Sequence, residues 1–299
     1  MKTMRNAAIL LLSAMAADIA AAQAPTTEQI IVKGERDRGQ IEQFVSQLKP
    51  AQGDTQLGKF LQPICPSVTG LADRQNRRVA DRMREVAQAA GIDVARPGCD
   101  ANIAVLVVTN KAATMKALMA RNSHLFYGLP LSTVHAMERS SSPAVAWQVV
   151  DEIGTDGMPL EPVRLTSDGD NRAAAPDEAR VVRSFGAVSR LRELTVPQFL
   201  DSIVIIEASA AQKFTATQLA DYALMRALVG TGDAFSPPPQ SILGMLSAAS
   251  SGGEAPLSVT WGDIALLKSL YATSNAVSAI VQRDAIATRM ESELAARQR

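Results

Sequence analysis

The stretch Ile103-Ala104-Val105-Leu106-Val107-Val108 decides the fold more than any other part of this 299-residue chain. Its residues are all apolar, so it lacks the alternation of a strand with one face in water. An unbroken run of this length is typical of a strand that is covered on both faces. We therefore expect a central strand here, with helices packed on either side of its sheet.

Segments with the periodicity of helices and strands surround this stretch. Further strands are predicted at residues 29–34, 60–65, 144–150 and 202–207. Helices are predicted at residues 41–48, 73–90 with Asp73 as the N-cap, 111–121, 132–139, 215–227, 261–271 and 278–297. This order of elements indicates an α+β fold in which helices pack against a mixed sheet.

The first 24 residues have the layout of a secretory signal peptide. Lys2 and Arg5 precede an apolar run at residues 7–17, and small residues follow at 20–24. The apolar run is too short to span a bilayer, and small residues favour cleavage after Ala22 or Ala24. The pattern predicts an exported protein, in the periplasm of a Gram-negative bacterium or outside the cell.

The rest of the chain divides at one loop. Residues 25–153 are expected to form an α/β half, and residues 181–299 an α+β half with a helix-rich end. Residues 154–180 are rich in Asp, Gly, Pro and Ala and predict a long exposed loop, with a hairpin excursion as the alternative. One compact unit and two tightly joined halves both fit this pattern.

The charge of the chain limits its partners. Lys2, Arg5 and Asp18 leave with the predicted signal peptide, so 28 basic and 29 acidic residues remain. A net charge this close to zero does not attract nucleic acid or anionic lipid. No later segment is apolar enough for a transmembrane helix. The expected partner is therefore an envelope protein or a small ligand.

The two cysteines, Cys65 and Cys99, flank a predicted helix. In an oxidising compartment, such a pair indicates one disulfide. Two metal-binding thiolates are the alternative, but the chain has no CxxC motif and no cluster of histidines to support them. We predict a disulfide, with no metal site and no cofactor.

The two histidines, His124 and His135, are the obvious candidates for acid–base chemistry. Gly128 and Pro130 lie between them, so the two imidazoles do not share one helix face. A hydrolase could combine one of them with a serine, but no Gly-x-Ser-x-Gly elbow is present. Positions on the surface or on a helix face are the simpler interpretation.

Residues 257–271 read Leu-Ser-Val-Thr-Trp-Gly-Asp-Ile-Ala-Leu-Leu-Lys-Ser-Leu-Tyr, and Met245 lies in a predicted turn upstream. With the strand at 202–207 and the helix after Thr215, this order resembles the closing half of a zincin-type metalloprotease. The closest resemblance is to the matrixin-like metzincins and related secreted bacterial families. The resemblance implies a zincin-like scaffold in the C-terminal part of the chain.

The chemistry of a zincin is missing from this part of the chain. A zincin holds zinc with His-Glu-x-x-His on one helix, whereas residues 217–222 read Thr-Gln-Leu-Ala-Asp-Tyr. Thr215 and Gln218 instead have the spacing of a capping box. Asp221 remains as a conceivable metal ligand together with distant residues. The resemblance therefore implies a scaffold without catalysis.

Two classes of function follow from these observations. The first is a non-catalytic binding or interaction protein of the cell envelope, for which the resemblance implies a zincin-like scaffold. The second is a periplasmic hydrolase with an unrecognised site, whose candidate residues are Gln218, Asp221, His124 and His135. A hydrolase requires these residues to converge in a concave site, whereas a binding protein is expected to show an exposed apolar patch or an open sheet edge.

Overall fold

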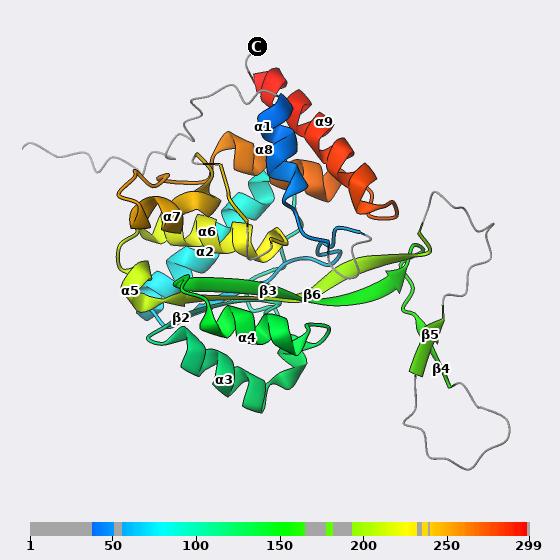
Figure 1. Ribbon diagram of the computed structural model, residues 1–299, viewed down its shortest axis with the longest axis horizontal. Coiled ribbons are helices and arrows are strands. Elements are labelled where there is room, and N and C mark those ends of the chain that lie inside the picture. The colour runs from blue at the N-terminus through cyan, green and yellow to red at the C-terminus, as the bar shows by residue number, and fades with distance from the viewer. Residues whose placement is uncertain are drawn as a thin grey trace, which may run out of the picture.

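One mixed four-stranded sheet lies at the centre of the protein in the computed structural model (Figure 1). Its strands are β1 (Pro66–Thr69), β2 (Ile103–Val108), β3 (Ala144–Gly154) and β6 (Thr195–Glu207). The order across the sheet is β1-β2-β6-β3, with β1, β2 and β6 parallel and β3 antiparallel to β6. The predicted α+β class with a mixed sheet is confirmed.

The structure describes residues 38–50, 56–164, 178–181, 193–231, 235–238 and 240–297. The predicted signal peptide at 1–24 and the predicted strand at 29–34 lie outside these residues. Within them, no helix has both the length and the apolar character that crossing a membrane requires.

The predicted strand at residues 60–65 is wrong by several positions. The segment forms only single bridges, between Lys59 and Gln198 and between Ile64 and Val94, and the strand begins at Pro66. Pro63 lacks the N–H group that a continuous ladder needs, so pairing is interrupted there. Pro66 is tolerated because it is the first residue of β1, which lies at the edge of the sheet.

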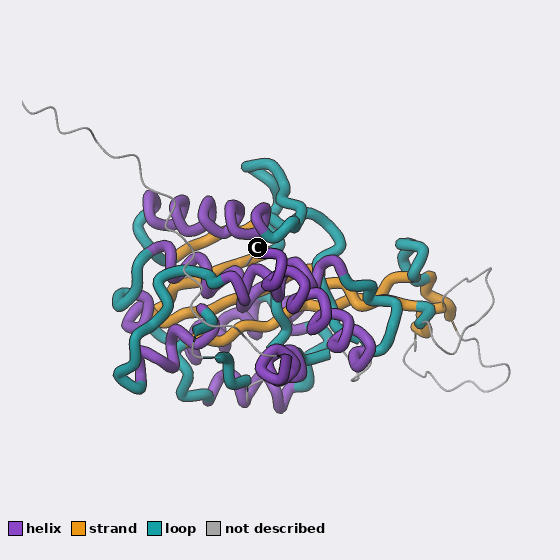
Figure 2. The backbone as a smooth tube through the Cα atoms, turned by 90° about the horizontal axis from the view of Figure 1, so that it is seen from above, coloured by secondary structure: helices purple, strands orange, loops and turns teal. Residues whose placement is uncertain are grey.

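Helices cover both faces of the sheet, as the apolar run in β2 predicts (Figure 1). On one face lie α2 (Asp73–Ala89) and α6 (Ala216–Leu228), and on the other lie α3 (Lys111–Arg121), the 3-10 turn η1 (Ser123–Phe126) and α4 (Leu131–Arg139). Figure 2, seen from above, shows helices lying over the strands of the sheet. Farther out on the α6 side are α1 (Arg38–Ser46), α8 (Trp261–Ala272) and α9 (Ala279–Arg297). The remaining short helices are α5 (Ala208–Ala211), η2 (Ile242–Gly244) and α7 (Met245–Ser250).

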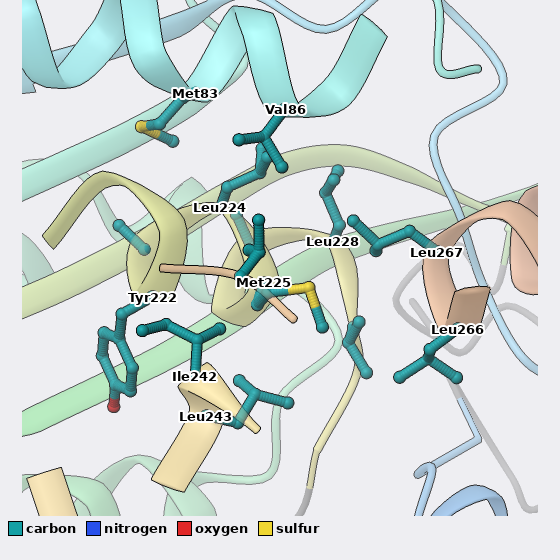
Figure 3. Packing of buried hydrophobic residues seen from close by; sticks show 14 of the residues in the cluster. Met83, Val86, Tyr222, Leu224, Met225, Leu228, Ile242, Leu243, Leu266 and Leu267 are labelled. Carbon is teal, nitrogen blue, oxygen red and sulfur yellow. The ribbon is translucent and has the colours of Figure 1, made fainter. Parts of the chain in front are cut away.

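Two hydrophobic clusters lie on the two faces of the sheet. Val204 and Ile206 of β6 belong to the larger cluster with α2 and α6, whereas Ile203 and Ile205 belong to the smaller cluster with α4. This alternation follows from the period of two along a strand. Figure 3 shows part of the larger cluster, in which Met83 of α2 lies above the apolar side chains of α6.

The N-cap of α2 differs from the prediction. Ala72 is the N-cap residue, and Asp73 is the first residue of the helix itself. In that position the carboxylate lies beside the free N–H groups of the first turn, where the helix dipole favours a negative charge. Asp73 therefore stabilises the start of α2 without capping it through a side-chain hydrogen bond.

The predicted disulfide between Cys65 and Cys99 is confirmed. It joins the residue before β1 to the loop before β2, with the two Cα atoms 6.2 Å apart. Asn102 supports the junction, because its Oδ1 accepts a hydrogen bond from the Cys65 N–H at 2.6 Å. The bond therefore holds together the amino ends of two parallel strands.

β6 comes from the C-terminal half of the chain, yet it lies between β2 and β3 of the N-terminal half. Both halves thus contribute to one sheet. Residues 195–201 of β6 pair only with β3 within the four-stranded sheet, and this two-stranded part extends beyond β1 and β2 (Figure 1). In the described part of the connection that follows β3, β4 (Glu161–Arg164) and β5 (Glu178–Val181) form an antiparallel pair.

Candidate functional site

The two histidines lie in the layer of α3 and α4. His124 is exposed in η1. The His135 side chain on α4 is 40% exposed, and its Nδ1 lies 3.3 Å from Glu138 Oε2. Lys116 approaches the same carboxylate at 3.2 Å. Hydrogen bonds from Lys116 and then His135 lower the pKa of Glu138. These are the contacts of a solvated helix face.

Gln218 lies on α6, on the opposite face of the sheet, and every polar atom of its side chain is engaged. Its backbone N–H donates to Thr215 Oγ1 at 3.2 Å, and its Oε1 accepts from the Thr215 N–H at 3.0 Å. Its Nε2 donates to the Pro256 carbonyl at 2.9 Å. The predicted capping box is therefore present, and Gln218 also fixes the segment before α8.

Asp221 is fully buried on the same helix and forms an ion pair with Arg82 of α2. Its Oδ1 accepts from Arg82 Nε at 2.9 Å. Its Oδ2 accepts from Ser258 Oγ and from the Val259 N–H, each at 2.8 Å. A buried carboxylate needs this many partners to offset the loss of water. Asp221 therefore joins α6, α2 and the approach to α8, and its oxygens are already occupied.

A second buried carboxylate, Asp263, also joins separate elements through its hydrogen bonds. It lies in the segment that resembles a metzincin. It forms a capping box with Thr260 at the start of α8. Its Oδ1 accepts from Ser241 Oγ at 2.5 Å, and its Oδ2 accepts from the Ile242 N–H at 3.0 Å. The Thr-x-x-Asp spacing is a signal for this cap that our sequence analysis missed.

The structure does not bring the four predicted catalytic residues together. His124 and His135 lie on one side of the sheet, and Gln218 and Asp221 on the other. Across the described ranges, no group of three or more His, Cys, Asp or Glu side chains is placed to hold a metal ion.

A cavity of about 220 Å³ lies where the open side of β3 meets α6. Its wall includes the first residues of β3, the turn before β3, α6, and the segment from η2 to α7. Polar side chains reach it from three of these elements: Ser140, Ser142, Tyr222, Arg226 and Ser247. This cavity is our candidate site.

Arg226 is the charged group of the cavity. Its Nε is buried and has no hydrogen-bond partner, and no carboxylate of the described residues lies within ion-pair distance of its guanidinium. Its neighbour Tyr222 faces the border of the hydrophobic cluster (Figure 3). Burial raises the pKa of Tyr222, and the positive charge of Arg226 acts in the opposite direction. Among the described residues, the cavity thus combines a neutral phenol with a cation that has no carboxylate partner.

Two of the cavity serines, Ser140 and Ser142, are held in place by Lys111. This lysine follows β2 and is only 3% exposed. Its Nζ donates to the carbonyl oxygens of Ser140 at 2.5 Å and Ser142 at 2.8 Å. Burial lowers the pKa of Lys111, and the nearby Glu207 acts in the opposite direction. The lysine therefore fixes the backbone of Ser140 and Ser142, the turn whose side chains line the cavity.

Sequence analysis did not identify this site. The one available signal was Arg226, which lies seven residues after Leu219 on the stripe that also carries Tyr222 and Ala223. A cation at a position where the periodicity of the helix requires an apolar residue marks a group that needs a partner. Ser140 and Lys111 carry no such signal, because only the fold brings them near α6.

No family model matches the chain, and comparisons with curated proteins and with solved structures found no significant match.

Proposed function

We propose that this chain is an exported protein that binds a ligand or partner without catalysis. One observation carries the proposal: the four candidate hydrolase residues are committed to structural bonds or lie on opposite faces of the sheet. Asp221 is saturated by Arg82, Ser258 and the backbone of Val259. The candidate site instead offers hydroxyl groups and a cation that no carboxylate of the described residues pairs with, and both suit binding.

Export is the second part of the proposal. Disulfides persist in oxidising compartments, and the Cys65–Cys99 bond is compatible with one. The predicted signal peptide supports the periplasm of a Gram-negative bacterium as that compartment. The resemblance of residues 257–271 to a metzincin stays a prediction. If the relationship exists, the scaffold lacks the histidines that would hold zinc.

The alternative class, a periplasmic hydrolase, is distinguished by turnover. Purified mature protein is incubated with panels of ester, amide, glycoside and phosphoester substrates, beside a heat-denatured sample. We expect no turnover above the denatured control. Turnover that disappears in His124→Ala, His135→Ala or Asp221→Asn protein that is still folded would contradict the proposal.

A further inference from the structure

We propose that the cavity beneath α6 binds a small organic carboxylate through Arg226. This inference rests on the proposed binding function and names the chemical class of the ligand. It concerns the 220 Å³ cavity described above, which lies between the start of β3 and α6.

The charge of the cavity selects an anion. Among the described residues that line it, Arg226 is the one cation, and its buried Nε–H has no acceptor. A buried donor without an acceptor destabilises the protein. The planar guanidinium fork matches the two oxygens of a carboxylate, one of which would give this Nε–H its acceptor.

The single charge favours a carboxylate over a phosphate. Lys111 lies nearby, but its Nζ is directed at the carbonyl oxygens of Ser140 and Ser142. One guanidinium balances one carboxylate, whereas a phosphate dianion would leave a buried negative charge without a partner. Phe235, Leu243 and Leu246 supply an apolar wall for the rest of an organic ligand.

The size and shape of the cavity favour a small molecule over a peptide. Its volume of about 220 Å³ lies below the range of roughly 300–1,000 Å³ that is usual for drug-sized ligands. An extended peptide would need the free edge of β3. The Gln148 side chain holds α6 over this part of β3, because its Nε2 donates to the carbonyls of Arg226 at 3.1 Å and Ala227 at 3.3 Å.

The position of the cavity in the fold agrees with a binding site. It lies beside Ala144, which pairs with Ile206 close to the carboxyl end of β6. In open sheets with parallel strands, ligands bind outside the carboxyl ends of those strands. Lys111, the first residue of α3, and Glu207, the last residue of β6, meet at the same edge, where the Lys111 N–H donates to Glu207 Oε1 at 3.1 Å.

The test uses the mature, disulfide-bonded protein in thermal-shift and calorimetric titrations. The probes are acetate, propionate and lactate, the uncharged amides propionamide and lactamide, and inorganic phosphate, all at matched ionic strength in chloride. We expect at least one carboxylate to raise the melting temperature in a saturable way, and its amide to have no effect. Arg226→Met should weaken that binding at least tenfold.

Two further variants keep the test decisive. Arg121→Met removes an exposed arginine from α3 in the same way and should leave the response unchanged. Arg226→Lys keeps the charge but loses the fork, so it should bind more weakly than the wild type even if Arg226→Met fails to fold.

The other outcomes separate this inference from the proposed function. No response to any carboxylate, or a response that Arg226→Met retains, overturns the carboxylate site and leaves the binding function standing. Phosphate binding that depends on Arg226, without carboxylate binding, also overturns it. Consumption of a bound carboxylate would overturn the proposed function while the site itself stands.

Discussion

Asp221 and Arg82 form an ion pair inside the protein, with Asp221 Oδ1 2.9 Å from Arg82 Nε. The two residues lie 139 positions apart, on α6 and α2. The Asp221 side chain is fully buried, whereas that of Arg82 is 23% exposed. The residue that most resembles a catalytic acid is therefore a support of the packing between two helices.

Replacing Asp221 should lower the stability of the protein severely. Asp221→Asn keeps the shape of the side chain but removes the buried counter-charge of Arg82, which keeps only the exposed Glu85 at 3.7 Å. Breaking a buried pair usually lowers the free energy of unfolding by roughly 3–5 kcal/mol, and the partial exposure of Arg82 places our expectation near 3 kcal/mol. Urea unfolding measures the change.

The control is Asp81→Asn, which removes an exposed partner of Arg84 and should change stability by less than about 0.5 kcal/mol. Equal stability of the two variants would contradict this role of Asp221.

Removing the disulfide should lower the stability by a comparable amount. Cys65 and Cys99 lie 34 positions apart, and for a loop of this length the chain-entropy model gives about 3–4 kcal/mol. The double variant Cys65→Ser/Cys99→Ser is compared with the wild type by urea unfolding. A reductant should destabilise the wild type and leave the double variant unchanged. A wild type that is insensitive to the reductant under unfolding conditions would refute the bond.

Lys59 should make the stability depend on alkaline pH. The side chain is 8% exposed, and its Nζ donates to the carbonyls of Tyr271 at 2.9 Å and Thr273 at 2.6 Å, at the end of α8. Burial lowers the pKa of Lys59 from 10.5 to about 8. Between these pH values the unfolded chain holds more protons than the folded one. The free energy of unfolding therefore rises with pH in this window, and this stabilisation is lost as pH falls through 8.

The measurement is the free energy of unfolding of wild type and Lys59→Met from pH 7 to pH 10. The difference between them should move in favour of the wild type by about 2 kcal/mol across this range. Lys213→Met, which alters an exposed lysine, is the control. A difference between wild type and Lys59→Met that does not change with pH would show that Lys59 titrates as it does in the unfolded chain.

The histidines should be dispensable for both stability and binding. His124 is exposed, and His135 lies 3.3 Å from Glu138, which also pairs with the exposed Lys116. Such surface pairs contribute roughly 0–1 kcal/mol. The double variant His124→Ala/His135→Ala should unfold within about 1 kcal/mol of the wild type and bind the same carboxylate with unchanged affinity. A loss of binding would place a histidine in the site and favour the hydrolase class.

Local signals in the sequence were sufficient to predict those strands and caps that depend on residues close by in the sequence. The apolar run at residues 103–108 predicted β2 at its observed bounds, because coverage on both faces removes the need for alternation. The capping box of Thr215 and Gln218 was predicted because its partners are three residues apart. Residues 60–65 were predicted as an extended segment broken by Pro63 and Pro66, whereas the strand itself begins at Pro66, because Pro is tolerated as the first residue of an edge strand.

The candidate site could not be predicted in the same way. Its polar residues come from the turn before β3, from α6 and from α7, and they meet only because β3 adds to the sheet beside β6. Asp221 was misleading for a related reason. Nothing near it in the sequence shows that Arg82 and Ser258 will surround its carboxylate.

The measurement that tests the account most directly is ligand-observed NMR of a carboxylate in the presence of a small amount of the mature protein. We predict saturation transfer to the ligand with wild type but not with Arg226→Met, and no new resonances over a day of incubation. Product resonances that grow beyond one equivalent of protein would contradict a non-catalytic binding protein. Equal saturation transfer with both proteins would contradict Arg226 as the residue that holds the ligand.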